Sequence, residues 1–318
     1  MPNAPKPPSK PPNPVMRPQA NICDYEGSNY RTEFWENTGR AYEDQVERIA
    51  LRRLLPTQGR RLLEVGAGFG RLTNEYHGYD QVVLLDYSLS QLQYAQEHLG
   101  RSPRFVYVAV DAYHLPFRAG VFDGASMIRV IHHMADPRAV LSEIRRVMTP
   151  GGTFILEHAN KRNLKAILRH ALGKQDWNPH DLAPVEFVEL NFDFHPEYIR
   201  DELQAAGFAP RQRVPVSFFR VPTLKEKIRT DWLVNADSVL QRTGLLVTPS
   251  VFVKNVATGD TPNNMALAND NEDIEALFAN PSNGGPLVRE GDVLVSSETG
   301  ERYAIRDGIY DFKAPLED

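Results

Sequence analysis

Short apolar runs alternate, over the first half of the chain, with segments in which apolar residues recur at helical spacing. The runs at 62–65, 82–85 and 105–110 are almost wholly apolar, which is typical of strands buried on both faces of a sheet. Between the second and third runs, apolar residues from Leu89 to Leu99 recur every three or four positions, as on one face of a helix. This alternation predicts an α/β fold with a mostly parallel sheet.

The same pattern continues on both sides of this region. Apolar residues between Tyr42 and Leu54 predict a helix ahead of the first strand. Further strands are expected at Gly124–Val130 and Thr153–Leu156. A helix over Ala139–Val147 lies between them, and the following Thr149-Pro150-Gly151-Gly152 ends it, because proline and glycine do not continue helices.

A glycine-rich bend follows the first strand, with the sequence Glu64-Val65-Gly66-Ala67-Gly68-Phe69-Gly70. Glycine is needed where a backbone turns sharply and where a ligand must lie against bare main chain. We expect a helix over Arg71–Tyr76 and then the second strand, which ends in Asp86. An acid at that place can accept hydrogen bonds from a ribose, so the stretch predicts an adenosine pocket.

The spacing of the glycines favours one adenosine cofactor over another. A dinucleotide needs G-x-G-x-x-G, whereas this chain has Gly66-x-Gly68-x-Gly70 with Glu64 ahead of it. An acid beside the loop suits ammonium and sulfonium groups better than a pyrophosphate. The E-x-G-x-G-x-G pattern resembles motif I of the class I S-adenosylmethionine-dependent methyltransferases.

The resemblance to these methyltransferases extends over residues 60–160, where five motifs occur in order. Asp111-Ala112 after the third strand resembles the family's adenine-contacting acid, and the segment 114–123 resembles its L-P-F-x-x-x-x-F-D turn. The resemblance implies a Rossmann-like, mostly parallel seven-stranded sheet with helices on both faces. Two late segments, Val214–Phe219 and Ser250–Lys254, would form the antiparallel pair that closes it.

The resemblance also implies a set of cofactor contacts and S-adenosylmethionine as the cofactor. The glycine loop would hold the methionine side, the acid after the second strand the ribose, and the acid after the third strand the adenine. The expected contacts are Glu64, Gly66, Ala67, Gly68, Gly70, Asp86, Tyr87, Asp111, Ala112 and Arg129.

Methyl transfer needs a general base only when the acceptor arrives protonated. His133, after the fourth strand, is the candidate, because a histidine is tunable near neutral pH; a purely structural role is the alternative. Glu157 and His158, after the fifth strand, are further pocket candidates. Upstream, Tyr30 or Trp35 would either cover the cofactor or hold the leading helix on the sheet.

Composition divides the chain further. The predicted organisation has four parts: a disordered proline-rich tail at residues 1–20, a methyltransferase domain at 21–256, a polar linker at 257–284 and a small β module at 285–318. The domain would carry two insertions, at 160–194 and 222–243. The first insertion would carry a helix at Leu164–Leu172 and then an irregular stretch. The second would be one helix over Leu224–Leu240, and the linker would hold a short helix at Asn271–Phe278.

The last segment ends in Y-x-I-x-D-G-I-x-x-F at residues 303–312, which resembles the Trm112-like zinc-ribbon module. Val288 and Leu294 are apolar where that module carries metal cysteines, so no metal is expected.

Charge, apolar runs and cysteine content disfavour several classes of function and location. The net charge of −5 argues against general nucleic-acid binding, and no apolar run approaches the roughly 18 residues of a membrane span. A single cysteine, Cys23, and no apolar leader favour the cytoplasm. The prediction is therefore a cytoplasmic methyltransferase acting on a small molecule. The alternatives are tRNA or protein as acceptor, a nucleotide-dependent oxidoreductase, or a non-catalytic binding protein; oligomeric state is open.

Overall fold

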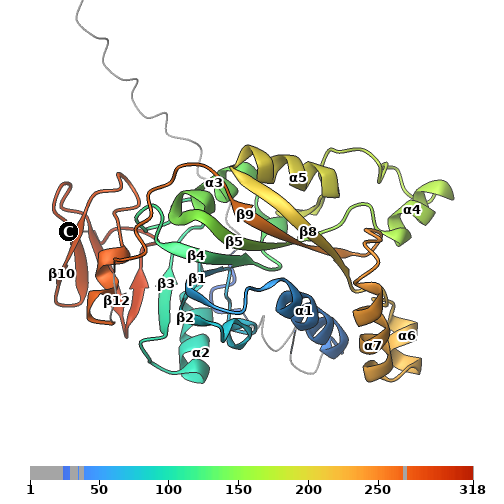
Figure 1. The fold of residues 1–318 in the computed structure, drawn as a ribbon, viewed down its shortest axis with the longest axis horizontal. Helices are drawn as coiled ribbons and strands as arrows, with labels where there is room; N and C mark the ends of the chain where they lie inside the picture. Colours follow the sequence, from blue (N-terminus) through green and yellow to red (C-terminus); the bar gives the residue numbers. More distant parts are fainter. Residues whose placement is uncertain (1–23, 29–34, 36–38, 268–270, 318) are drawn as a thin grey trace, which may run out of the picture.

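Five parallel strands form the centre of the molecule in the computed structural model, which describes residues 24–28, 35, 39–267 and 271–317 (Figure 1). They lie in the order β3-β2-β1-β4-β5. Their bounds are β1 Gly59–Val65, β2 Tyr79–Asp86, β3 Phe105–Ala109, β4 Phe122–Met127 and β5 Met148–Ala159. The expected tail at residues 1–20 lies outside the described residues.

Two antiparallel strands complete the seven-stranded sheet beyond β5. Strand β9 (Ser250–Ala257) pairs antiparallel with both β5 and β8 (Phe208–Val216). The Rossmann-like, mostly parallel sheet with this closing pair is confirmed. One detail differs: Pro150 and the glycines after it lie inside β5, where the pairing with β4 shifts register, rather than in a separate turn.

Helices cover both faces of the sheet (Figure 1). One face carries α1 (Ala41–Leu54), α2 (Leu89–Leu99) and α7 (Thr230–Leu240), and the other carries α3 (Pro137–Val147) and α5 (Pro196–Ala205). Because side chains alternate along a strand, Leu62 packs with the first set and Leu63 with the second. The core is therefore two apolar layers, one on each side of the sheet.

Two of the expected helices are wrong. The segment after the glycine bend forms only a short 3-10 helix, η2 (Thr73–Tyr76), because few residues separate Gly70 from the start of β2. The expected single helix of the second insertion is two, α6 (Pro222–Lys227) and α7, because Ile228 and Arg229 between them are extended.

The first insertion carries α4 (Leu164–Ala171), as expected. The stretch expected to be irregular instead contains a two-stranded hairpin, β6 (Val185–Val188) with β7 (Asn191–Asp193). The turn of the hairpin lies beside the 3-10 helix η3 (Ile131–His133), since the carbonyl of Leu190 accepts a hydrogen bond from His133.

The C-terminal strands continue the same sheet, which therefore has eleven strands. Strands β10, β11, β12 and β13 pair antiparallel in sequence order, and β13 pairs parallel with β3. Their bounds are Leu287–Glu290, Val293–Ser296, Arg302–Arg306 and Ile309–Asp311. The stretch expected as a linker includes the 3-10 helix η4 (Asn271–Leu277), and Leu277 and Phe278 are buried.

Candidate functional site

A pocket opens at the carboxyl ends of β1, β2, β3 and β4, which is where open α/β sheets bind ligands. All ten expected cofactor contacts except Gly70 line it, and so does His133. The lining residues that the sequence did not single out include Tyr25, Phe69, Arg71, Leu72, Tyr76, Gln91, Tyr113, Ser126, Ile128, Val130 and Met134. Trp35 lines the pocket as well, whereas Tyr30 lies outside the described residues.

The glycine loop leaves open space over its main chain. Gly66 has a φ of 70°, and a Cβ there would lie 2.1 Å from Cγ2 of Val130. Gly68 has a φ of 53°, and a Cβ there would meet no atom within 4 Å, so its position opens toward the pocket. Gly70, with a φ of 78°, closes the bend by donating its N–H to the carbonyl of Ala67 (3.0 Å). Gly70 therefore shapes the loop and does not line the pocket.

Asp86, at the end of β2, is held by the main chain. Its Oδ2 accepts from the N–H of Gly68 (2.7 Å) and its Oδ1 from the N–H of Ser88 (2.9 Å), at the start of α2. Burial raises the pKa of Asp86, although these N–H groups oppose the rise. A carboxylate oxygen has two lone pairs, so each oxygen can also accept from a ligand hydroxyl.

The other acidic strand end faces the same pocket. Asp111 follows β3, and its Oδ1 accepts from the N–H of Tyr113 (3.0 Å). Ala112 beside it is small and largely buried. Tyr87, next to Asp86, lies under the ammonium of Lys313, whose Nζ is 5.4 Å from the ring centroid. The C-terminal strands thus reach the edge of this pocket.

Glu64 is the buried acid at the base of the glycine loop. The hydroxyl of Thr73 donates to its Oε2 (2.6 Å). Burial raises the pKa of Glu64 to about 7, so its protonation is balanced near neutral pH. A cationic ligand in the pocket would favour the charged form.

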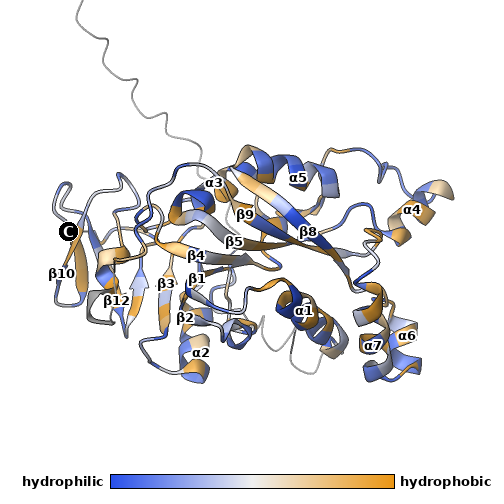
Figure 2. Cartoon of the chain, viewed as in Figure 1, coloured by the Kyte–Doolittle hydropathy of each residue, from blue (hydrophilic) through white to orange (hydrophobic). Residues whose placement is uncertain are grey.

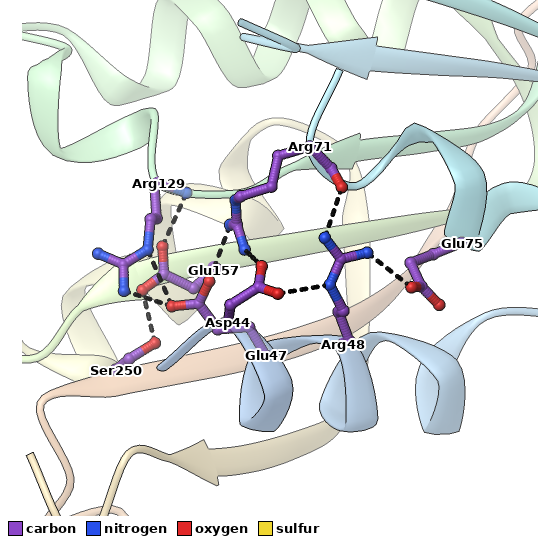
Figure 3. Close-up of polar contacts among 8 residues, drawn as sticks. All are labelled: Asp44, Glu47, Arg48, Arg71, Glu75, Arg129, Glu157 and Ser250. Atoms are coloured by element: carbon purple, nitrogen blue, oxygen red, sulfur yellow. Dashed lines mark hydrogen bonds and ion pairs between the residues drawn. The ribbon is translucent and has the colours of Figure 1, made fainter. Parts of the chain in front are cut away.

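Arginine side chains form one wall of the pocket, and a buried acid from α1 holds them (Figure 3). Glu47 is fully buried and accepts from Nε of Arg129 (2.8 Å) and Nη2 of Arg71 (2.8 Å). Burial would raise the pKa of Glu47, but the two guanidiniums hold it below its ordinary value. Arg71 also lies against Trp35, with its Cζ 3.7 Å from the ring centroid.

Arg129 sits at a strained point of the backbone, with a φ of 60°, a value that non-glycine residues rarely adopt. Its N–H donates to Oε2 of Glu157 (2.9 Å), whose Oε1 accepts from the hydroxyl of Ser250 (2.6 Å). Glu157 therefore supports the turn behind the pocket and does not line it. His158 is fully buried within β5, so neither of these two is a pocket residue.

The hydrogen bonds of His133 fix its tautomer. Nδ1 lies 2.9 Å from the carbonyl oxygen of Leu190, which can only accept, so Nδ1 carries the proton. Nε2 is then an acceptor, and the hydroxyl of Tyr25 lies 3.3 Å from it. Burial lowers the pKa of His133, so the ring is neutral at pH 7. Nε2 thus faces Tyr25, which lines the pocket together with His133.

Two further properties bear on the class of site. Within the described residues, no three His, Cys, Asp or Glu side chains are grouped so that they could hold a metal ion. Nor does any helix of the described part combine the length and apolar character needed to cross a bilayer.

The pocket fits S-adenosylmethionine. The open main chain at Gly68 leaves room for a ligand, Glu64 suits its cationic amino-acid end, and the acids after β2 and β3 can accept from its ribose and adenine. The strand order together with this loop defines the class I methyltransferase fold.

Comparison with known proteins agrees with this class. Residues 63–156 match the family model described as a methyltransferase domain. The O-methyltransferase cnsE of Penicillium expansum is 32% identical over 146 residues, which are 43% of this chain and 53% of that protein. The O-methyltransferase resE of Aspergillus sclerotiorum is 33% identical over 175 residues, or 53% and 61% of the two chains. The chain thus spans little more than half the length of these relatives.

A solved structure shares the fold. The S-adenosylmethionine-dependent methyltransferase of Thermotoga maritima superposes with a TM-score of 0.50 at 18% identity, over 71% of this chain and 94% of that one. This likeness concerns the fold alone.

Proposed function

We propose that this protein transfers a methyl group from S-adenosylmethionine to an oxygen atom of a small-molecule acceptor. The observation that carries the proposal is the convergence of Gly68, Asp86 and Asp111 on one pocket at the carboxyl edge of the sheet. The O-methyltransferase relatives support an oxygen acceptor, and the family match disfavours the oxidoreductase alternative.

Different pocket residues bind the cofactor and accept the proton of the acceptor. The bound cofactor supplies a methyl group already activated on sulfur, so alignment and exclusion of water carry much of the rate. Asp86 binds the ribose, Asp111 and Ala112 the adenine, and Glu64 faces the ammonium. Nε2 of His133 takes the acceptor's hydroxyl proton, at the position now occupied by the hydroxyl of Tyr25.

The C-terminal strands are proposed to be a Trm112-like module that works without zinc. The turn from β12 to β13 places Asp307 and Gly308 at φ values of 51° and 82°, which explains the D-G pair of its motif. Val288 and Leu294 occupy positions where the zinc-ribbon module carries its metal-binding cysteines. The cytoplasmic location stays a prediction.

Calorimetry with S-adenosylhomocysteine tests the cofactor assignment. The intact protein should bind in the micromolar range, and Gly68→Arg should abolish binding because its side chain enters the pocket. Gly173→Arg is the matched control: its φ of 64° and open surroundings are similar, but it follows α4 outside the pocket. A well-folded wild type that gives no binding heat, or a Gly68→Arg variant that binds normally, would contradict the assignment.

Methyl-transfer assays test both the class of acceptor and the role of His133 as general base. We expect S-adenosylhomocysteine to form with hydroxylated small molecules, and not with tRNA or protein. His133→Gln should lower kcat by about 10²- to 10⁴-fold without changing cofactor affinity. Because burial holds the pKa of His133 below 6.5, the wild-type kcat at saturating cofactor should be flat above that pH and fall in acid. An unchanged kcat in the variant would assign His133 a structural role.

A further inference from the structure

Helix α4 and its C-terminal cap residue, Leu172, present three leucine side chains to solvent, while Ile167 of the helix is half-buried. The buried residue of the helix is the small Ala166, whereas Leu164, Leu168 and Leu172 are 53%, 53% and 66% exposed. These leucines recur every four residues, so they share one face of the helix. Figure 1 shows α4 at one end of the molecule, away from the sheet, with β10 at the other end.

Polar contacts at its base hold α4 in place without the leucines. The side chain of Asn163 caps the helix by accepting from the N–H of Ala166 (3.0 Å), and the N–H of Leu164 donates to the carbonyl of Val247 (2.7 Å). Just before the helix, Nζ of the buried Lys161 donates to the carbonyls of Asp181 and Ala183. The outward leucines are therefore not required for folding.

The same segment is strongly basic. Residues 161–175 contain five Lys or Arg and no Asp or Glu. Arg162, Lys165, Arg169 and Lys174 are exposed, and within the described part of the chain none of them forms an ion pair. Figure 2 shows polar and apolar residues side by side on this helix. An exposed leucine face flanked by lysine and arginine is typical of helices that lie in the surface of an anionic bilayer.

We propose that α4 with its flanking basic residues docks the protein on an anionic lipid surface. The alternatives fit less well. A second copy meeting this face symmetrically would bring two basic helices together, where like charges repel. Nucleic acid would match the charge but leave the three leucines unused. The proposal does not depend on the methyltransferase assignment.

Vesicle flotation of the full-length protein tests this surface. Phosphatidylcholine vesicles with added phosphatidylglycerol should carry the protein upward at low salt, and vesicles of phosphatidylcholine alone should not. The double variant Leu168→Ser/Leu172→Ser should lower partitioning at least about tenfold, since apolar burial is lost. Lys165→Gln/Arg169→Gln should do the same through charge. The control is Val288→Ser, an equally exposed apolar residue on β10, which should change nothing.

Thermal melting of every variant should match the wild type, because all five positions are exposed. Three results would overturn the proposal. One is the absence of flotation on the anionic vesicles, and another is equal flotation of the leucine variant. The third is a dimer in size-exclusion chromatography that Leu168→Ser/Leu172→Ser dissolves, which would assign the face to a second copy.

Discussion

At the scale of single residues, Glu64 should make cofactor binding depend on pH. Burial raises its pKa to about 7, so below that pH the free protein holds it largely protonated. A bound ammonium group favours the carboxylate, so binding must release a proton there. We expect the affinity for S-adenosylhomocysteine to fall by up to about tenfold per pH unit below 7 and to level off above it. Calorimetry in buffers of different ionisation enthalpy measures the released proton.

The control for this prediction is Glu64→Gln, whose amide oxygen can still accept from Thr73. Its affinity should vary less with pH and its binding should release no proton. Proton release that persists in Glu64→Gln would mean that another group titrates. Measurements should stay below about pH 7.5, where the ligand's own amino group remains charged.

The sequence located those site residues that belong to a local motif. Gly66 and Gly68 were found because glycines at this spacing form a sharp bend against which a ligand can lie, and Asp86 because it ends a strand. Tyr25 has no such signal. Its segment is held on α2 by contacts such as those of Glu26, which accepts from the N–H groups of Leu89 and Ser90 (2.7 and 3.1 Å). Contacts between segments far apart in the chain leave no local pattern.

At the scale of elements, the periodicity predicted the long, well-buried strands and helices. The periodicity failed to predict short elements, in which few residues determine the secondary structure. A helix was expected over residues 71–76, but the short connection between β1 and β2 leaves room only for η2. The β6–β7 hairpin was missed because its strands are only four and three residues long and β6 is mostly exposed, so they show little apolar alternation.

Elements without a recognisable sequence motif also hold pocket side chains in place. Helix α1 contributes Glu47, which holds Arg71 and Arg129 on the pocket wall. The sequence placed Arg129 near the cofactor but gave no partner for it. A glutamate on a helix ordinarily faces water, and only the fold shows that Glu47 is fully buried.

At the scale of the whole molecule, the C-terminal strands and the methyltransferase sheet share one core. A row of buried aromatic rings connects them, with Phe122 against Phe117, Phe117 against Phe278, Phe278 against Phe312 and Phe312 against Tyr303, at centroid distances of 5.0–5.6 Å. Composition alone suggested a linker here, because residues 257–284 are rich in Asn, Asp and other polar residues. The few apolar side chains among them do the packing.

The rings predict that the C-terminal strands are needed for folding and for cofactor binding. Deleting residues 285–318 would expose Phe278 and the edge of β3, so we expect aggregation or a melting temperature at least about 10 °C lower. Phe312→Ala should cost about 3–5 kcal/mol of unfolding free energy in urea. The deletion also removes the N–H of Phe312 that donates to the carbonyl of Ala109 (2.7 Å), two residues before Asp111, so the affinity of the truncated chain for S-adenosylhomocysteine should fall as well. A truncated chain that melts and binds like the full-length protein would show instead that the strands form an independent module.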